Sequence, residues 1–276
     1  MGRDRVESKE IDRYSIWSTG MKLLINGISQ SDVSKLPNSD ALLRGDGLFE
    51  TILAIDDKPV ALDRHLARLE RSADKLQITL PASIDIKFGI SNLLEAQTGQ
   101  SKVRLVVLSD GNWFISAEPL VESAQSVSLT KFSDPINSKS GLVGIKSISY
   151  GLSLLAVRKA KQLGFDDSIF INEEGFVVET GFSNLLILSG STWQTPALST
   201  GCLSGITREL LIKWFDVQEV ELTYDQFLAK DAIYTTSCLR LIQPVKKVDD
   251  KLFNENHLGN ELITQFKEKL FSNINP

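Results

Sequence analysis

Three polar features of this sequence belong to types that do chemistry. Lys146 stands just ahead of a run with helical periodicity, and a lysine amine can act as a nucleophile and carry protons. Glu179 follows at the end of a strand-like run. The stretch SGITRELL, from Ser204, opens a helix, and a helix N-terminus offers backbone N–H donors to an anion. Because each feature alone is usual on a solvated surface, only their combination indicates a site.

The other reactive residues exclude several chemistries. Cys202 and Cys238 stand alone, without the paired spacing of a zinc site or a disulfide framework. The chain has 2 His residues, His65 and His257, and it lacks a G-x-S-x-G motif. We therefore expect no metal site and no hydrolase with a Ser or Cys nucleophile.

The composition is that of an ordinary globular protein. The chain has 276 residues, of which 42% are apolar and 24% charged, which is enough for two modest domains. The net charge is -5 and the basic residues are scattered, so we expect no nucleic-acid partner. Residues 1–20 are charged throughout and are predicted to be a solvated extension. Without an apolar leader or a run of membrane length, the sequence predicts a cytoplasmic protein outside the membrane.

The elements that position these residues fall into two groups, the first of which covers residues 21–132. Strands are predicted at KLLING, as a hairpin in GDGLFETILAIDDKPVAL, and as a pair in VRLVVLSDGNWFISAEPL. Between them, IKFGISNLLEAQ has helical character. An earlier helix is indicated by apolar residues spaced by four and three, namely Leu62, Leu66, Leu69, Ala73 and Leu76. This pattern predicts a small α+β domain.

A polar run with Pro135 predicts an interdomain linker at 133–140, followed by a larger domain at 141–276. There, a helix from Leu152 to Leu163 precedes a hairpin, SIFINEEGFVVE, and a strand, NLLIL. A second helix begins near Gly205. The runs DAIYTTS and RLIQPV are strand-like, and LGNELITQFKEKLF is an amphipathic terminal helix.

The segment GIKSISYGLSLLAVRKAKQLGFDDSIFINEEGFVVETGFSNLLIL resembles the core signature of the class IV, fold type IV, pyridoxal-phosphate aminotransferase family. The resemblance covers roughly residues 22–248. It implies an α+β fold of two domains: a small N-terminal α/β sandwich-like domain and a larger C-terminal β-barrel-like domain with helices. It also implies pyridoxal 5'-phosphate (PLP) as cofactor and a homodimer.

The resemblance also implies roles for the residues that match the signature. Lys146 would form the Schiff base with PLP and serve as general acid and base, and Glu179 would keep the pyridine nitrogen protonated. Asn184 matches a third signature position. Tyr150 would lie near the cofactor's phenolic oxygen, or else simply pack at a helix start.

Phosphate contacts are implied by three further matches. The helix LDRHLARLERSADKL resembles the HLxRLxxSA element, which makes Arg68 the expected cation and leaves His65 a packing role. The GITR motif and the turn in YTTSC supply the other expected contacts, which are Ile206, Thr207, Thr236, Ser237 and Cys238.

The segment RGDGLFETI matches a family element that lines the substrate side of the cleft. We expect a small substrate that carries an amino group and a carboxylate, and the carboxylate needs a cation. The sequence offers four candidates without choosing among them: Arg44, Lys102, Arg104 and Arg240.

Three activities share this scaffold. TTSCLRLIQPV is closer to the lyase pattern NSLxxxxPV than to the Thr-Ala turn of branched-chain aminotransferases, although Ser237 and Cys238 depart from it. We therefore expect a 4-amino-4-deoxychorismate lyase of folate biosynthesis, which releases pyruvate and 4-aminobenzoate. The alternatives are an aminotransferase that uses 2-oxoglutarate and D-amino acids or branched-chain L-amino acids, and a protein that binds PLP without turnover. The Arg-x-His clamp of the D-amino acid enzymes is absent after Val103–Leu108.

Overall fold

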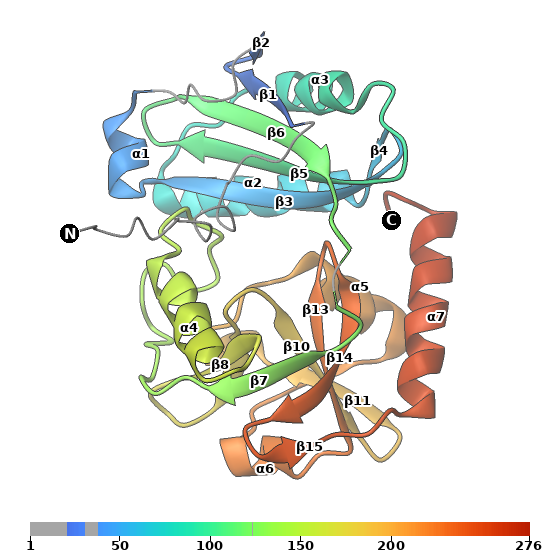
Figure 1. Ribbon diagram of the computed structural model, residues 1–276. Coiled ribbons are helices and arrows are strands. Elements are labelled where there is room, and N and C mark those ends of the chain that lie inside the picture. The colour runs from blue at the N-terminus through green and yellow to red at the C-terminus, as the bar shows by residue number, and fades with distance from the viewer. Residues whose placement is uncertain (1–20, 31–37, 123) are drawn as a thin grey trace, which may run out of the picture.

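The computed structural model describes residues 21–30, 38–122 and 124–276. Its two β-sheets lie one above the other in Figure 1, and each is accompanied by helices. The sheets are joined by the segment between Pro119 and Val127. The solvated extension predicted for residues 1–20 lies outside the described residues. No helix in the described ranges combines the length and the apolar character needed to cross a bilayer.

The first sheet is antiparallel and, over the described ranges, has six strands in the order β2-β1-β6-β5-β3-β4. The predicted hairpins are confirmed at Asp56-Asp57 and at Asp110-Gly111, where Gly111 has a φ of 88° that favours glycine. The strand bounds are β1 Lys22–Ile25, β2 Ile28–Gln30, β3 Gly47–Ile55, β4 Lys58–Pro59, β5 Gln100–Leu108 and β6 Trp113–Pro119.

Three helices accompany this sheet: α1 (Asp40–Arg44), α2 (Leu62–Leu76) and α3 (Ser83–Leu94). The predicted apolar face of α2 packs on the sheet through Leu66, Leu69 and Ala73. His65 and Arg68 are buried on the same helix, which is unusual for charged residues unless they are paired. The pairing that makes this burial possible is part of the site described below.

The second sheet curls into a half-barrel and, within the described ranges, has nine strands. Its order is β12-β11-β10-β13-β14-β7-β8-β9, with β15 beside β14. The bounds are β7 Val127–Lys131, β8 Asp167–Ile171, β9 Val177–Thr180, β10 Asn184–Ser189, β11 Thr192–Pro196, β12 Gln218–Val220, β13 Ala232–Ser237, β14 Leu241–Val248 and β15 Lys251–Leu252. The accompanying helices are α4 Gly151–Gln162, α5 Ile206–Phe215, α6 Tyr224–Leu228 and α7 His257–Ser272.

The chain passes from the first sheet to the second ahead of the linker predicted at residues 133–140. Strand β7 precedes that run, yet it pairs in parallel with β14 and β8 of the second sheet. Val127 and Leu129 are buried in the core of that sheet, so the change of sheet falls before β7. Parallel partners so distant in sequence leave no local signal, whereas the polar run with Pro135 is conspicuous. That run itself packs back on the second sheet, where Ile136 forms a β-bridge with Asn172.

Candidate active site

A cavity lies between the two sheets, with about 480 Å³ of space when the part open to solvent is counted. We call it the first cavity. Its walls come from α2, the segment before α4, the end of β9, the start of α5 and the end of β13. The structure brings all nine predicted cofactor residues to its lining: Arg68, Lys146, Tyr150, Glu179, Ile206, Thr207, Thr236, Ser237 and Cys238.

Lys146 is held in place through its backbone. Its carbonyl accepts a hydrogen bond from the Phe49 N–H of β3 at 2.9 Å, and the next residue, Ser147, forms a β-bridge with Leu48. The Nζ atom lies 4.3 Å from the centre of the Phe49 ring and 3.5 Å from the Tyr150 hydroxyl. Burial, aided by the nearby Arg68 charge, lowers the pKa of Lys146 to about 8. A substantial fraction of the amine is therefore neutral, and nucleophilic, near physiological pH.

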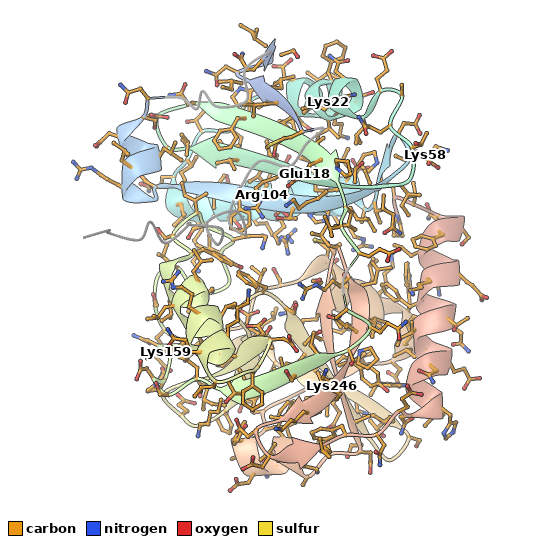
Figure 2. All side chains as sticks on the ribbon, viewed as in Figure 1. Lys22, Lys58, Arg104, Glu118, Lys159 and Lys246 are labelled. Carbon is orange, nitrogen blue, oxygen red and sulfur yellow. The ribbon has the colours of Figure 1, made fainter. Side chains whose placement is uncertain are left out.

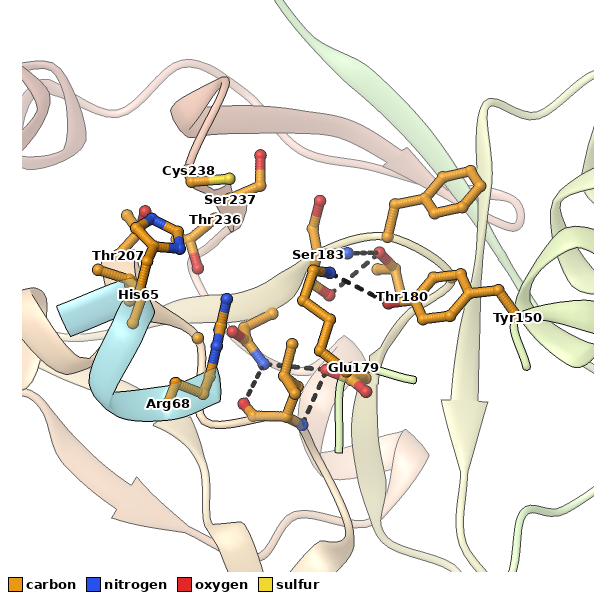
Figure 3. A pocket seen from close by; sticks show the side chains of 17 residues that line it. His65, Arg68, Tyr150, Glu179, Thr180, Ser183, Thr207, Thr236, Ser237 and Cys238 are labelled. Atoms are coloured by element: carbon orange, nitrogen blue, oxygen red, sulfur yellow. Dashed lines mark hydrogen bonds between the residues drawn. The ribbon is translucent and has the colours of Figure 1, made fainter. Parts of the chain in front are cut away.

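Glu179 is fixed by two donors at the end of β9. Its Oε2 accepts from Asn184 Nδ2 at 3.0 Å and from the Leu203 N–H at 3.1 Å (Figure 3). No ion pair holds it among the described residues. Burial raises the pKa of Glu179 to about 7, because the lost hydration outweighs the Leu203 N–H bond and the nearby Lys146 and Arg208 charges. Within the described ranges, the carboxylate therefore lines the cavity without a salt-bridge partner.

Asn184, which the sequence placed in the signature without a role, also donates to the Leu203 carbonyl at 2.9 Å. It thereby joins the end of β9 to the loop before α5. A Cβ on Gly205 would lie 1.9 Å from Asn184 Oδ1, so only glycine fits beside this amide. Gly205 caps α5 without a side chain, which leaves the first N–H groups of the helix available to an anion.

The end of β13 adds a hydroxyl that the fold leaves unpartnered. Thr236 is buried, and its Oγ1 has no hydrogen-bond partner among the described residues. Such an atom costs stability unless something else binds it. Cys238 is engaged, since its Sγ donates to the Thr51 carbonyl at 2.7 Å. In Figure 3, Thr207, Thr236, Ser237 and Cys238 lie on the same side of the cavity as Arg68, away from Glu179 and Tyr150.

Arg68 is held by a residue that sequence reasoning missed. Its Nε and one terminal nitrogen donate to the two oxygens of Glu50 at 2.9 and 2.5 Å, and its other terminal nitrogen donates to the Ser204 carbonyl at 3.0 Å. His65 Nδ1 lies 2.7 Å from the same Glu50 carboxylate. Glu50 sits inside the quoted segment RGDGLFETI, so the available signal was an acid in a largely apolar strand.

Burial alone would raise the pKa of Glu50, but the Arg68 charge and His65 outweigh burial and hold that pKa at about 2. Arg68 has five N–H donors, of which these contacts use three. Two donors remain for an anion in the cavity. The Glu50 carboxylate therefore fixes the Arg68 guanidinium in place and balances its charge, on the side of the guanidinium that these bonds occupy.

A second cavity adjoins the first and shares Lys146 and Tyr150 with it. Arg104 and Arg240 line it, and so does Lys102, which is ion-paired with Glu118. Figure 2 labels Arg104 and Glu118 on neighbouring strands of the first sheet. Arg44 is elsewhere: it ends α1, pairs with Asp40, and its side chain is 75% exposed. The structure thus brings three of the four candidate cations together and leaves Arg44 out.

Comparison with known proteins identifies the family. The model of the family described as amino-transferase class IV matches residues 47–248. The chain belongs to this family, and it is a PLP-dependent enzyme with the fold type IV architecture.

Relatives of similar length carry two different names. A protein of Methanocaldococcus jannaschii, provisionally named a branched-chain-amino-acid aminotransferase, is 28% identical and aligns over 90% of this chain and 95% of its own. The aminodeoxychorismate lyase of Bacillus subtilis is 25% identical over 83% of this chain and 87% of its own. The solved branched-chain aminotransferase of Thermoproteus uzoniensis superposes with a TM-score of 0.83 at 23% identity, covering 91% and 95% of the two chains.

Proposed function

We propose that the first cavity binds PLP with its phosphate on the Arg68 side and its ring nitrogen on the Glu179 side. The unpartnered Thr236 hydroxyl, the uncapped start of α5 and the two free donors of Arg68 support the phosphate placement. Ile206 would contribute through its N–H, and Thr207 through its N–H and hydroxyl. Ser237 and Cys238 would complete the rim, beside Thr236.

Lys146 would attach the cofactor and then carry protons, for which its lowered pKa of about 8 suits it. When bound, PLP withdraws electrons from the substrate carbon that bears the amino group. Glu179 would hold a proton on the ring nitrogen and so gain the cationic partner that the fold does not give it. Tyr150 would keep the Lys146 nitrogen oriented from 3.5 Å away.

For the reaction, we propose lyase action on 4-amino-4-deoxychorismate. The observation that carries this proposal is the pair of arginines, Arg104 and Arg240, in one cavity with Lys146. This substrate has two carboxylates, one on the ring and one on the enolpyruvyl group, and two guanidinium groups match two carboxylates. Lys146 would remove the proton from the carbon that bears the amino group. Breaking the bond from the ring to the enolpyruvyl oxygen, with proton return, then gives pyruvate and 4-aminobenzoate, with no keto-acid acceptor.

A second candidate, transamination, is favoured by the apolar part of the second cavity. Its lining includes Phe49, Val106, Ile148, Leu154 and Leu239, which suit the side chain of a branched-chain amino acid. In that reaction, one arginine would hold the single α-carboxylate. The enzyme would then need a keto acid such as 2-oxoglutarate to accept the amino group.

The deciding experiment incubates the purified enzyme with 4-amino-4-deoxychorismate without any keto acid and follows the fluorescence of 4-aminobenzoate. We expect turnover by the wild type, none by Lys146→Ala, and a loss of about tenfold or more in kcat/KM for Arg240→Leu. Arg44→Leu is the matched control, because Arg44 lies outside both cavities. Inactivity toward this substrate, together with transfer of amino groups from L-leucine to 2-oxoglutarate, would replace the lyase proposal with the transaminase.

We also propose that the enzyme is a cytoplasmic homodimer, as the family resemblance implies. Leu152, Leu154 and Leu155 of α4 and Phe182 are large apolar side chains that remain exposed in the single chain, which supports a subunit contact near the site. Light scattering should therefore give twice the chain mass of 30.6 kDa.

A further inference from the structure

A buried carboxylate next to the first cavity has no role in the function proposed above. Asp167 begins β8 and is 7% exposed, and no ion pair is formed with it among the described residues. Its Oδ1 accepts from the Ser168 N–H at 2.7 Å and from the Gly181 N–H at 3.1 Å. Its Oδ2 accepts from the Thr180 hydroxyl at 2.8 Å. Burying an unpaired carboxylate is costly, so these three bonds indicate a specific structural task.

Two of these bonds, those from Thr180 and Gly181, hold the turn that follows Glu179. Thr180 and Gly181 are the first two residues of this turn, which continues to Ser183 and returns the chain into β10. A Cβ on Gly181 would lie 2.7 Å from Asp167 Oδ1 and 2.8 Å from Val157 Cγ2. The turn is therefore clamped between the Asp167 carboxylate and helix α4, with no space for a side chain at Gly181.

Two aromatic rings, those of Phe182 and Tyr150, connect this turn to Lys146. Phe182, at its tip, stacks on Tyr150 with a centroid distance of 6.2 Å and an angle of 8°. The Tyr150 hydroxyl lies 3.5 Å from Lys146 Nζ. Phe182 and Ser183 also line both cavities.

We propose that Asp167 is a positioning residue for catalysis: its carboxylate sets the 180–183 turn, and Phe182 on that turn fixes Tyr150 beside Lys146. The inference rests on Lys146 being the cofactor lysine, and it holds for a lyase and a transaminase alike. Asp167 itself touches neither cofactor nor substrate.

The test is the pH midpoint of the visible absorbance band of the lysine-bound cofactor, because that midpoint reports the surroundings of the Lys146 nitrogen and is unaffected by the yield of folded protein. We expect Asp167→Ala to move it by more than about 0.3 pH unit. Asp166→Ala is the matched control: this neighbouring acid holds the Ser128 N–H and hydroxyl at 2.7 Å, away from the turn, and its midpoint should match the wild type.

Two further variants separate position from charge. Gly181→Ala keeps the Asp167 charge but displaces the turn, so it should move the midpoint as Asp167→Ala does, whereas Gly141→Ala, which has open space around it, should not. Asp167→Asn keeps the shape and loses the charge; its amide oxygen can still accept both N–H groups, so its midpoint should stay near that of the wild type.

An unchanged midpoint in Gly181→Ala, or a shift in Asp167→Asn as large as in Asp167→Ala, would overturn the positioning role. If Asp167→Ala does not fold, Gly181→Ala and Asp167→Asn decide the question. Failure of the underlying assignment looks different: the band would be missing from the wild type or would persist in Lys146→Ala.

Discussion

Two carboxylates flank the first cavity, and their surroundings differ. Glu50, behind Arg68, receives a bidentate guanidinium and an imidazole, and these bring the pKa of this carboxyl down to about 2. Glu179, in the opposite wall, accepts from an amide group and a backbone N–H among the described residues, and burial raises its pKa to about 7. The fold thus pairs Glu50 with Arg68, whereas Glu179 has no ion-pair partner among the described residues.

The difference indicates how the site divides its work. A cation that must hold a dianionic phosphate benefits from being locked in place, and Glu50 locks Arg68 while leaving two donors free. A carboxylate that must keep a proton on a heterocyclic nitrogen gains most when that nitrogen is its only cationic contact. On the proposed placement of PLP, cofactor binding would give Glu179 the cationic contact that it lacks among the described residues.

Of the substitutions considered, replacing Lys146, which lines the cavity together with Arg68 and Glu179, should have the largest effect on activity. Lys146→Ala is expected to lower activity by about 10³-fold or more and to abolish the absorbance band of the lysine-bound cofactor. The assay compares it with Lys159→Ala on α4, whose side chain is 44% exposed and which should retain full activity. Substantial activity in Lys146→Ala would contradict the assignment.

Removing the ion pair between Glu50 and Arg68 should mainly lower the stability of the protein. Glu50→Gln leaves Arg68 buried beside a neutral amide, so the free energy of unfolding should fall by about 3–5 kcal/mol in urea denaturation. Glu174→Gln removes a solvent-exposed ion pair with Lys139 and should change it by less than about 1 kcal/mol. Equal effects of the two substitutions would show that Glu50 does not hold Arg68 as described.

In the cofactor-free protein, Glu179 should make the free energy of unfolding depend on pH. The pKa of Glu179 in the fold, about 7, exceeds its ordinary value of 4.5, so the folded state binds the proton more tightly. Its contribution to the free energy of unfolding should therefore fall as the pH rises from 4.5 to about 7. Glu179→Gln should lack that fall.

In the wild type, His65 opposes this trend, because burial lowers its pKa from 6.5. Since His65 is common to both proteins, the difference between their denaturation curves isolates Glu179. Parallel curves for wild type and Glu179→Gln would contradict the raised pKa.

The smallest effect concerns the unpartnered hydroxyl. Thr236→Val should weaken PLP binding by about tenfold, a loss of one hydrogen bond, without destabilising the cofactor-free protein. Thr195→Val is the matched control: Thr195 Oγ1 donates to the Leu185 carbonyl at 2.8 Å, so this variant should lose stability and keep its affinity. Equilibrium titration with PLP and thermal unfolding measure the two quantities.

Much of this site could be predicted from the sequence. The spacing of Leu62, Leu66 and Leu69 predicted α2 correctly, and the family signature selected residues that the structure brings to one cavity. Signature residues are found because each stands at a fixed place beside a recognisable element.

Glu50 and β7 were missed for a common reason. Glu50 takes its meaning from Arg68 and His65, which lie on a different element and meet it only in the folded chain. Strand β7 likewise pairs with β8 and β14, which lie much farther along the chain. The same holds for the candidate cations: the sequence ranked Arg44 with Arg104, and only the fold separates them.

The most direct test of the contrast between the two ends is the chemical shift of the ring nitrogen in ¹⁵N-labelled PLP bound to the enzyme at neutral pH. We expect a protonated nitrogen in the wild type and an unprotonated one in Glu179→Gln, with Glu50→Gln unchanged wherever it still binds the cofactor. The same shift in wild type and Glu179→Gln would contradict the account, because Glu179 would then not be the group that keeps the ring nitrogen protonated.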